Sequence, residues 1–349
     1  MTYAVRKADL ERDRDTILEF WRKNHHKALD AKYQWMYDGN PDGRAHVWIL
    51  QHAESGACVG LTALFPRRIW VNDQSLLAGI AGDLLVSPDH RTLWPARLLQ
   101  KSALAAAQAG IVDFVYGFPN SAAEGLVRAS GYRLLGRLTQ FTKVMRTAHL
   151  LTKFGLPSPL VSLIAPLVNF VLKLASIETG GTDRRYRCQE VDDFDVGLCR
   201  VWKEHQSRFR ISIQRSQEYL RWKYLRDPDD HHRIFSAFDA DSGEPKAFIV
   251  YRSEDNRLDI REYVVGSDKD AGTAVIADFF RRARAAGVDS VSFTIVETAR
   301  IAHEMRGLGF LRGSRGRNAY LYCPEHLGEM RRVLGDVDNW WLVASDEDT

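Results

Sequence analysis

The sequence predicts an α/β (α+β) protein with two tandem domains, each a mixed twisted sheet flanked by helices. Three observations indicate this fold class: the length, an internal repeat, and the order of the predicted strands and helices. A chain of 349 residues is longer than one hydrophobic core usually accommodates. Its 45% hydrophobic and 27% charged residues form an ordinary globular mixture, which excludes extensive disorder and collagen-like repeats.

The internal repeat is carried by a Trp-x-Tyr-x-x-x-Pro motif, which occurs in residues 33–41 and again in residues 220–228. Further matches follow at the same offset: Trp48 with Phe235, and Ser55-Gly56 with Ser242-Gly243. An ordered series of matches indicates two copies of one fold. The repeated aromatic side chains are of the type that fills the edges of a core.

The repeat also predicts the domain boundaries. We expect an N-terminal domain at 1–149, an apolar inter-domain linker or helix at 150–180, and a degenerate C-terminal copy at 181–349.

The elements of the first copy follow from its hydrophobic periodicity. Strands are expected at 3–8, 45–53, 58–71, 75–88 and 111–119, with a pair of strands at 132–146. Helices are expected at Asp13–His25, at Trp94–Gln108 and at Ser121–Ser130, the last opened by a capping box of Ser121 and Glu124. The resulting order, βαβββαβαβ, is typical of a mixed sheet covered by helices.

The charge and cysteine content exclude several classes of protein. The chain has 48 Lys and Arg against 45 Asp and Glu, a net charge of +3 that does not indicate a nucleic-acid-binding protein. Its four cysteines form no C-x-x-C pair, so we expect neither a disulfide framework nor a metal site. The charged N-terminal residues lack the apolar run of a signal peptide, and we expect a cytoplasmic protein.

Residues 154–172 form a 19-residue stretch without a charge, interrupted by Pro157, Pro159 and Pro166. A membrane span needs about 20 consecutive apolar residues, which this stretch does not provide. We expect a buried inter-domain helix, and the alternative is a helix that lies on a membrane surface.

The segment DLLVSPDHRTLWPAR (83–97) carries the first candidate site. A strand ends at Val86, a loop contains His90 and Arg91, and a helix begins near Trp94. The unpaired N–H groups and the dipole of a helix N-terminus favour an anion, so this junction is a candidate phosphate site. Alternatively, Arg91 makes a surface ion pair with Asp89.

A second segment, residues 113–132, ends a strand before Asn120 and continues as a helix to Gly131. Together the two segments resemble the GNAT N-acyltransferase family. The family signature R/Q-x-x-G-x-G/A corresponds to residues 91–96, and N-x-x-A-x-x-L-Y-x-x-x-G-F/Y corresponds to residues 120–132. Two positions depart from the family: Trp94 replaces a glycine, and Val127 replaces the tyrosine that acts as general acid.

The resemblance implies a function. Acetyl-CoA or another acyl-CoA is the co-substrate, and no metal is needed. The residues that the resemblance assigns to its binding are Leu84, Leu85, Val86, Arg91, Thr92, Leu93, Trp94, Ala96 and Asn120. The acceptor is a small primary amine. The C-terminal NWWLVASDED also resembles tandem-GNAT proteins of bacterial surface-polysaccharide loci, which implies an amino sugar.

Two residues are candidates for the catalytic proton transfers. Asp83 lies in an apolar strand, where an aspartate is rare; it is either a general base or a buried carboxylate that holds the sheet. Tyr116 supplies a proton or packs in the core. The second copy has acidic residues in the corresponding loop (Asp268 and Asp270), so we expect it to be a scaffold or one wall of the acceptor site.

Two alternatives remain open at this point. One is a Fem-type aminoacyl transferase, which uses aminoacyl-tRNA and tandem copies of the same fold. The other is a CoA-binding pseudo-acyltransferase without turnover, which the substitutions at Trp94 and Val127 permit.

Overall fold

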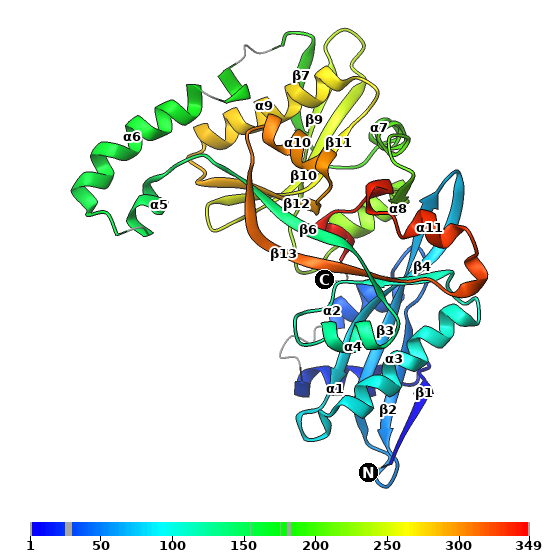
Figure 1. The fold of residues 1–349 in the computed structure, drawn as a ribbon. Helices are drawn as coiled ribbons and strands as arrows, with labels where there is room; N and C mark the ends of the chain where they lie inside the picture. Colours follow the sequence, from blue (N-terminus) through cyan, green and yellow to red (C-terminus); the bar gives the residue numbers. More distant parts are fainter. Residues whose placement is uncertain (1, 25–29, 154, 175, 180–182, 348–349) are drawn as a thin grey trace. The chain divides into compact units, whose positions relative to one another are not determined.

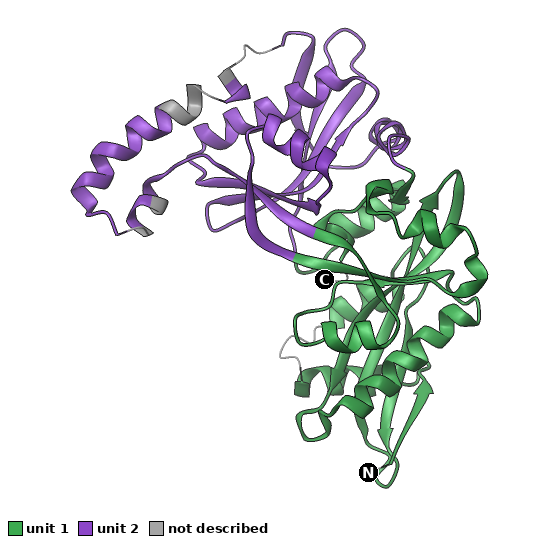
Figure 2. Cartoon of the chain, in the orientation of Figure 1, with its two compact units in different colours: residues 1–137, 210–229, 317–349 green, residues 138–209, 230–316 purple. Residues whose placement is uncertain are grey.

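The computed structural model describes all residues except 1, 25–29, 154, 175, 180–182 and 348–349. They form two compact units, each with its own strands and helices (Figures 1 and 2). Unit 1 contains residues 1–137, 210–229 and 317–349, and unit 2 contains residues 138–209 and 230–316. Each unit therefore gathers segments from both halves of the sequence.

Unit 1 is built on a mixed sheet with the strand order β1–β2–β3–β4–β5–β13. Strand β8 also pairs with β3, and β14 pairs with β8. The strands are β1 (Tyr3–Lys7), β2 (His46–His52), β3 (Cys58–Val71), β4 (Gln74–Val86), β5 (Phe114–Gly117), β8 (Ile211–Ile213), β13 (Leu311–Tyr322) and β14 (Trp340–Trp341). The helices are α1 (Arg14–Asn24), α2 (Asp30–Tyr33), α3 (Leu93–Gln108), α4 (Glu124–Ala129), α8 (Gln217–Leu220) and α11 (Met330–Leu334), with π-helical turns at Gln34–Asp38 and Arg221–Leu225.

Helices cover both faces of this sheet, which explains why β3 is almost continuously apolar. Leu64 of β3 packs with Leu99 and other apolar side chains of α3. Its neighbour Phe65 points to the opposite face, where Tyr37 lies with ring centroids 5.2 Å apart. Trp21 of α1 contacts the same tyrosine at 5.2 Å. Because successive side chains of a strand point to opposite faces, β3 contributes to two hydrophobic cores, one on each face of the sheet.

The repeated Trp-x-Tyr motif lies in the two π-helical turns, and its tryptophans meet inside unit 1. The rings of Trp35 and Trp222 stack with centroids 4.8 Å apart. Each indole Nε1 donates a hydrogen bond to the backbone carbonyl of the other residue, at 2.8 and 2.9 Å. Both side chains are buried, and their N–H groups are paired as burial requires. The prediction that these aromatic residues pack in the core is confirmed.

Unit 2 has a sheet in the order β6–β12–β11–β10–β9–β7. The strands are β6 (Arg133–Val144), β7 (Tyr186–Val191), β9 (Arg233–Asp239), β10 (Pro245–Glu254), β11 (Arg257–Val265) and β12 (Ser290–Val296). The helices are α5 (Ala148–Lys153), α6 (Ser158–Leu174), α7 (Val196–Gln206), α9 (Lys269–Ala285) and α10 (Ala299–Gly307).

Strands β6 and β13 each contribute to both units. The sequence predicts a pair of strands over 132–146, but β6 is one continuous strand. It cannot fold back as a hairpin because residues 138–144 pair with β12 in unit 2. Conversely, residues 320–322 at the end of β13 pair with β5 in unit 1.

Other expected boundaries are close to the observed ones, with one error. Helix α3 begins at Leu93, one residue before the predicted start, whereas His25 of the predicted first helix lies outside the described residues. The capping box at Ser121 is wrong. Asn120 forms the turn instead, because its Oδ1 accepts the backbone N–H of Ala123 at 3.0 Å.

The apolar stretch 154–172, of which Phe154 lies outside the described residues, forms most of α6. The expectation of a buried helix is wrong for one of its faces, because Leu163 and Leu167 are 75% and 67% exposed. In the described part of the chain, no helix combines the length and apolarity that crossing a membrane requires.

Candidate active site

The candidate active site of unit 1 is a gap between the parallel strands β4 and β5. The two strands pair from Ala78↔Phe114 to Ala81↔Gly117, where β5 ends, whereas β4 continues to Val86. At the last pair the backbones are very close, since a Cβ on Gly117 would lie 3.2 Å from both the Cβ and the carbonyl oxygen of Ala81. The two strands are in close contact at this pair and separate beyond it, which leaves a wedge-shaped gap beside the end of β4.

A β-bulge shapes the β4 wall of this gap. Leu61 pairs with Leu85 and Ala63 pairs with Gly82, so two residues of β4, Asp83 and Leu84, lie opposite Thr62. Asp83 has φ = +49°, a left-handed conformation that aspartate adopts more readily than most residues. The bulge therefore interrupts the regular alternation of β4 where an acidic side chain lies.

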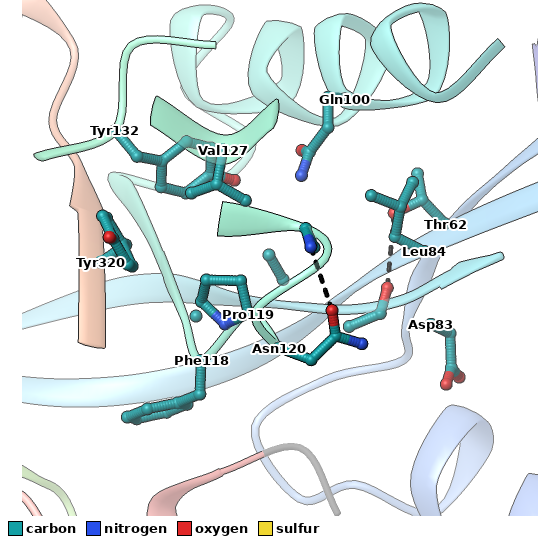
Figure 3. Close-up of a pocket in the computed structure, with 14 residues that line it drawn as sticks. Thr62, Asp83, Leu84, Gln100, Phe118, Pro119, Asn120, Val127, Tyr132 and Tyr320 are labelled. Carbon is teal, nitrogen blue, oxygen red and sulfur yellow. Dashed lines mark hydrogen bonds between the residues drawn. The ribbon is translucent and has the colours of Figure 1, made fainter. Parts of the chain in front are cut away.

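The gap contains a cavity of about 160 Å³ (Figure 3). Asp83 and Leu84 line it from β4, and Asn120 lines it from the turn after β5. Gln100 of α3 and Val127 of α4 complete the wall. Residues from both candidate segments, 83–97 and 113–132, thus meet around one cavity.

Asp83 is held in place by a buried tyrosine. The hydroxyl of Tyr37 donates a hydrogen bond to Oδ2 of Asp83 at 2.5 Å. Tyr37 is fully buried and also stacks on Tyr33, at 4.9 Å, so its hydroxyl has a fixed position. Sequence analysis assigned Tyr37 to the core through the repeated motif but missed this contact, because the two residues are 46 positions apart.

Two further polar groups that line the cavity were also missed. The Oε1 of Gln100 and the hydroxyl of Tyr132 are buried and have no hydrogen-bond partner among the described residues. Buried polar atoms are normally paired, so these two are available to hydrogen-bond a polar ligand in the cavity. Burial raises the pKa of the Tyr132 hydroxyl well above its ordinary value of 10, so this hydroxyl is protonated at neutral pH.

The start of α3 has the features of an anion site. Thr92 is its N-cap residue and makes no capping bond with its side chain, and Leu93, Trp94 and Ala96 lie in the first helical turn. Arg91 donates from Nε and Nη2 to the carbonyl of Val86 at 3.3 and 3.2 Å, which ties the loop to the end of β4. The guanidinium-bearing loop is therefore held beside a helix N-terminus that favours negative charge.

The corresponding helix of unit 2 has a different start. Asp268 caps α9 and accepts the backbone N–H groups of Asp270 and Ala271 at 3.1 and 3.4 Å. The hydroxyl of Tyr186 donates to the same aspartate at 2.5 Å. This N-terminus already holds a carboxylate, which opposes the binding of a second anion.

The remaining candidate residues have other surroundings. Tyr116 is fully buried and packs on Phe118 and Trp340, with centroids 5.9 and 6.4 Å apart, and burial raises its pKa well above 10. The indole of Trp94 is 59% exposed and lines a groove along α3 that also contains Lys101.

In unit 2, residues 261–263 of β11 were candidates for a wall of the acceptor site. Arg261 pairs with Asp259 at 3.2 Å, and Glu262 and Tyr263 are buried. Among the described residues, no group of three His, Cys, Asp or Glu side chains is arranged to hold a metal ion.

No family model and no curated protein matches the sequence. Solved structures do match. A conserved protein of unknown function from Enterococcus faecalis, described as a probable N-acyltransferase, has 13% identity and a TM-score of 0.69, over 93% of this chain and 73% of that chain. A GCN5-related N-acetyltransferase from Anabaena variabilis has 11% identity and a TM-score of 0.64, over 92% and 72% of the two chains.

The chain has the GNAT fold. N-myristoyltransferase from Saccharomyces cerevisiae, with bound myristoyl-CoA, is also similar, with 12% identity and a TM-score of 0.56 over 92% of this chain and 82% of that chain. The fold class predicted from the sequence is confirmed. In this GNAT fold, the residues of the two sequence motifs lie on the β4–β5 gap and on the start of α3.

Proposed function

We propose that the chain is an acyl-CoA-dependent N-acyltransferase and that the reaction takes place in unit 1. The observation that carries this proposal is the β4–β5 gap, which has Asp83 in its wall and the uncapped start of α3 beyond the end of β4. Similar structures described as N-acyltransferases, one with a bound acyl-CoA, support it. The finer proposal is acetyl transfer to a small primary amine, such as an amino sugar.

In this proposal the substrates bind along β4. The pantetheine amides pair with the backbone of Leu84, Leu85 and Val86. The pyrophosphate lies on the first turn of α3, with Arg91 as its counter-charge. Arg97 and Lys101, which line the groove beside Trp94, add positive charge on the same helix.

The chemistry requires the nitrogen to lose two protons and the sulfur to gain one. A primary amine with a pKa near 10 is mostly protonated at neutral pH, so Asp83 takes its first proton before the nitrogen attacks the thioester carbonyl. When the C–S bond breaks, the thiolate takes a proton from the Tyr132 hydroxyl, which lines the same cavity, and the second proton that leaves the nitrogen restores this hydroxyl. Tyr132 thereby performs the step that Val127 cannot, while Tyr116 has a packing role.

Arg91→Glu is expected to weaken acetyl-CoA binding by about 10- to 100-fold, because a charge-assisted contact is lost and a like charge is added. Isothermal titration calorimetry measures the affinity and the number of sites, which we expect to be one per chain. Arg12→Glu is the matched control, since Arg12 is an exposed arginine of the same unit. Unchanged affinity in Arg91→Glu, or two sites per chain, would contradict this assignment.

Tyr132→Phe is expected to lower turnover on the order of 10-fold, the effect of losing one hydrogen-bonding proton donor. It should not lower the melting temperature, because the hydroxyl that it removes has no partner among the described residues. CoA release and thermal unfolding are the two measurements. Wild-type turnover in Tyr132→Phe would assign the proton to water, and Val127→Tyr in that background then tests the usual position of the acid.

We also propose that residues 1–149 and 181–349 are copies of one domain, joined by residues 150–180. The π-helical turns at Gln34–Asp38 and Arg221–Leu225 share the offset of the repeat. So do Gly56 and Gly243, with φ of +69° and +70°. In this proposal the two copies have exchanged strands. Strand β6 of the first copy extends into unit 2, and strand β13 of the second copy extends into unit 1.

The two alternatives differ in what they release. A pseudo-acyltransferase binds acetyl-CoA but releases no thiol with any amine, whereas a Fem-type enzyme requires aminoacyl-tRNA. A CoA pull-down combined with a thiol-release assay separates both from the proposed enzyme. The four free cysteines support a reducing, cytoplasmic location.

A further inference from the structure

Helices α5 and α6 form a hairpin in unit 2 (Figure 1). One face of α6 exposes an apolar stripe. The inner side of α6 is buried through Val161 and Ala165. On its outer side four large apolar residues are 47–75% exposed: Leu160, Leu163, Leu167 and Phe170. Their spacing of three and four residues places them on one face of the helix. A contiguous apolar face of this kind marks an interaction surface.

Polar side chains of the hairpin make hydrogen bonds within the hairpin and to the residue that precedes it. Ser162 donates to the carbonyl of Pro159 at 2.8 Å, and Thr152 donates to that of Ala148 at 3.0 Å. Oδ1 of Asn169 accepts both the backbone N–H and the hydroxyl of Thr147 at 2.9 Å. Such local bonds reduce the cost of moving these groups out of water.

The segment of unit 2 that contains the hairpin carries charge of one sign. Residues 138–177 contain four Lys and Arg and no Asp or Glu. The next acidic residue, Glu178, is buried and paired with Arg284 at 2.6 Å. In the sequence, Lys153 is the last residue of α5 and Lys173 lies near the end of α6, and Arg146 is exposed just before α5. A second copy of the chain would bring the same positive charge to this face, whereas an anionic lipid surface complements it.

We propose that the α5–α6 hairpin docks the protein on the surface of an anionic membrane. The stripe enters the boundary between headgroups and acyl chains, and α6 lies parallel to the membrane plane. With 17 residues, α6 is about 25 Å long, and no described helix is suited to cross the membrane. This proposal does not depend on acyl transfer in unit 1.

Flotation of the full-length protein with vesicles tests the proposal. We expect it to float with vesicles of phosphatidylcholine and phosphatidylglycerol, and less with pure phosphatidylcholine or at high salt. Leu163→Asn combined with Leu167→Asn should reduce the partition coefficient about 100-fold, since each inserted leucine contributes about 10-fold. Leu311→Asn is the matched control, because this exposed leucine of unit 2 lies on β13.

Three outcomes would overturn the proposal. One is failure of the wild-type protein to float with anionic vesicles, and another is flotation of the double variant equal to that of the control. Light scattering without lipid gives the third: a dimer of the wild-type chain that the double variant dissociates would assign the stripe to a second copy. Circular dichroism of the double variant verifies that it is folded.

Discussion

Replacing Asp83 with asparagine is expected to slow acyl transfer by about 100- to 10,000-fold, the usual effect of losing a general base. The amide has nearly the same shape as the carboxylate but cannot take the proton of an ammonium group. Acyl-CoA binding should be unchanged, because the proposed contacts of the thioester are with the backbone of β4. CoA release with a panel of amino sugars, polyamines and amino acids measures the turnover, and calorimetry measures the binding.

Asp113→Asn is the matched control for this experiment. Asp113 is also a half-buried aspartate of unit 1, but its carboxylate accepts the backbone N–H of Leu77 at 2.7 Å, near the start of β5. Tyr37→Phe removes the hydrogen bond that positions Asp83 and should have a smaller effect, mainly on kcat. If Asp83→Asn turns over like the wild type, Asp83 has a structural role and the base must be found elsewhere.

Asp346→Ala is expected to lower the free energy of unfolding by about 3–5 kcal/mol, because it leaves a buried charge without its partner. Asp346 pairs with Arg215 at 2.7 Å, and the two side chains are 1% and 0% exposed. Asp346 also accepts the backbone N–H of Val343 at 2.8 Å. Urea denaturation followed by tryptophan fluorescence measures the change.

Two variants show whether burial is the cause. Asp183→Ala breaks an ion pair with Arg185 on the surface of unit 2 and should change stability very little. Arg215→Met combined with Asp346→Leu removes both buried charges and should restore most of the lost stability. A double variant as unstable as Asp346→Ala would show that the pair itself, and not an uncompensated charge, accounts for the loss.

The fold class and the strand–loop–helix junction at Arg91 were predictable because their signals are local. Strands β2 to β4 and helix α3 follow from apolar runs and periodicity, and the motif at Arg91 lies within one strand–loop–helix junction. The pairing of Trp35 with Trp222 was visible as a repeat, although nothing in the sequence shows that the two rings stack.

The missing parts of the candidate site are contacts between residues distant in sequence. Tyr37 meets Asp83 because a π-helical turn and a β-bulge, neither of which has a sequence signal, point both side chains to one place. Gln100 is a polar position in an apolar helix, and its burial depends on how α3 packs. The course of β6 into a second sheet was equally invisible, because a long strand and a pair of strands have the same apolar pattern.

The strand exchange has a consequence for synthesis on the ribosome. Unit 1 begins with the first residue but needs residues 317–349, which include the end of β13 and Asp346. At about 5–20 residues per second, translation of residues 138–316 delays that last segment by roughly 9–36 s. During this interval β5 lacks its neighbour β13, so the exposed edge of β5 can pair with incorrect strands. A nascent chain halted at residue 149 should therefore be sensitive to protease, whereas the finished protein resists it.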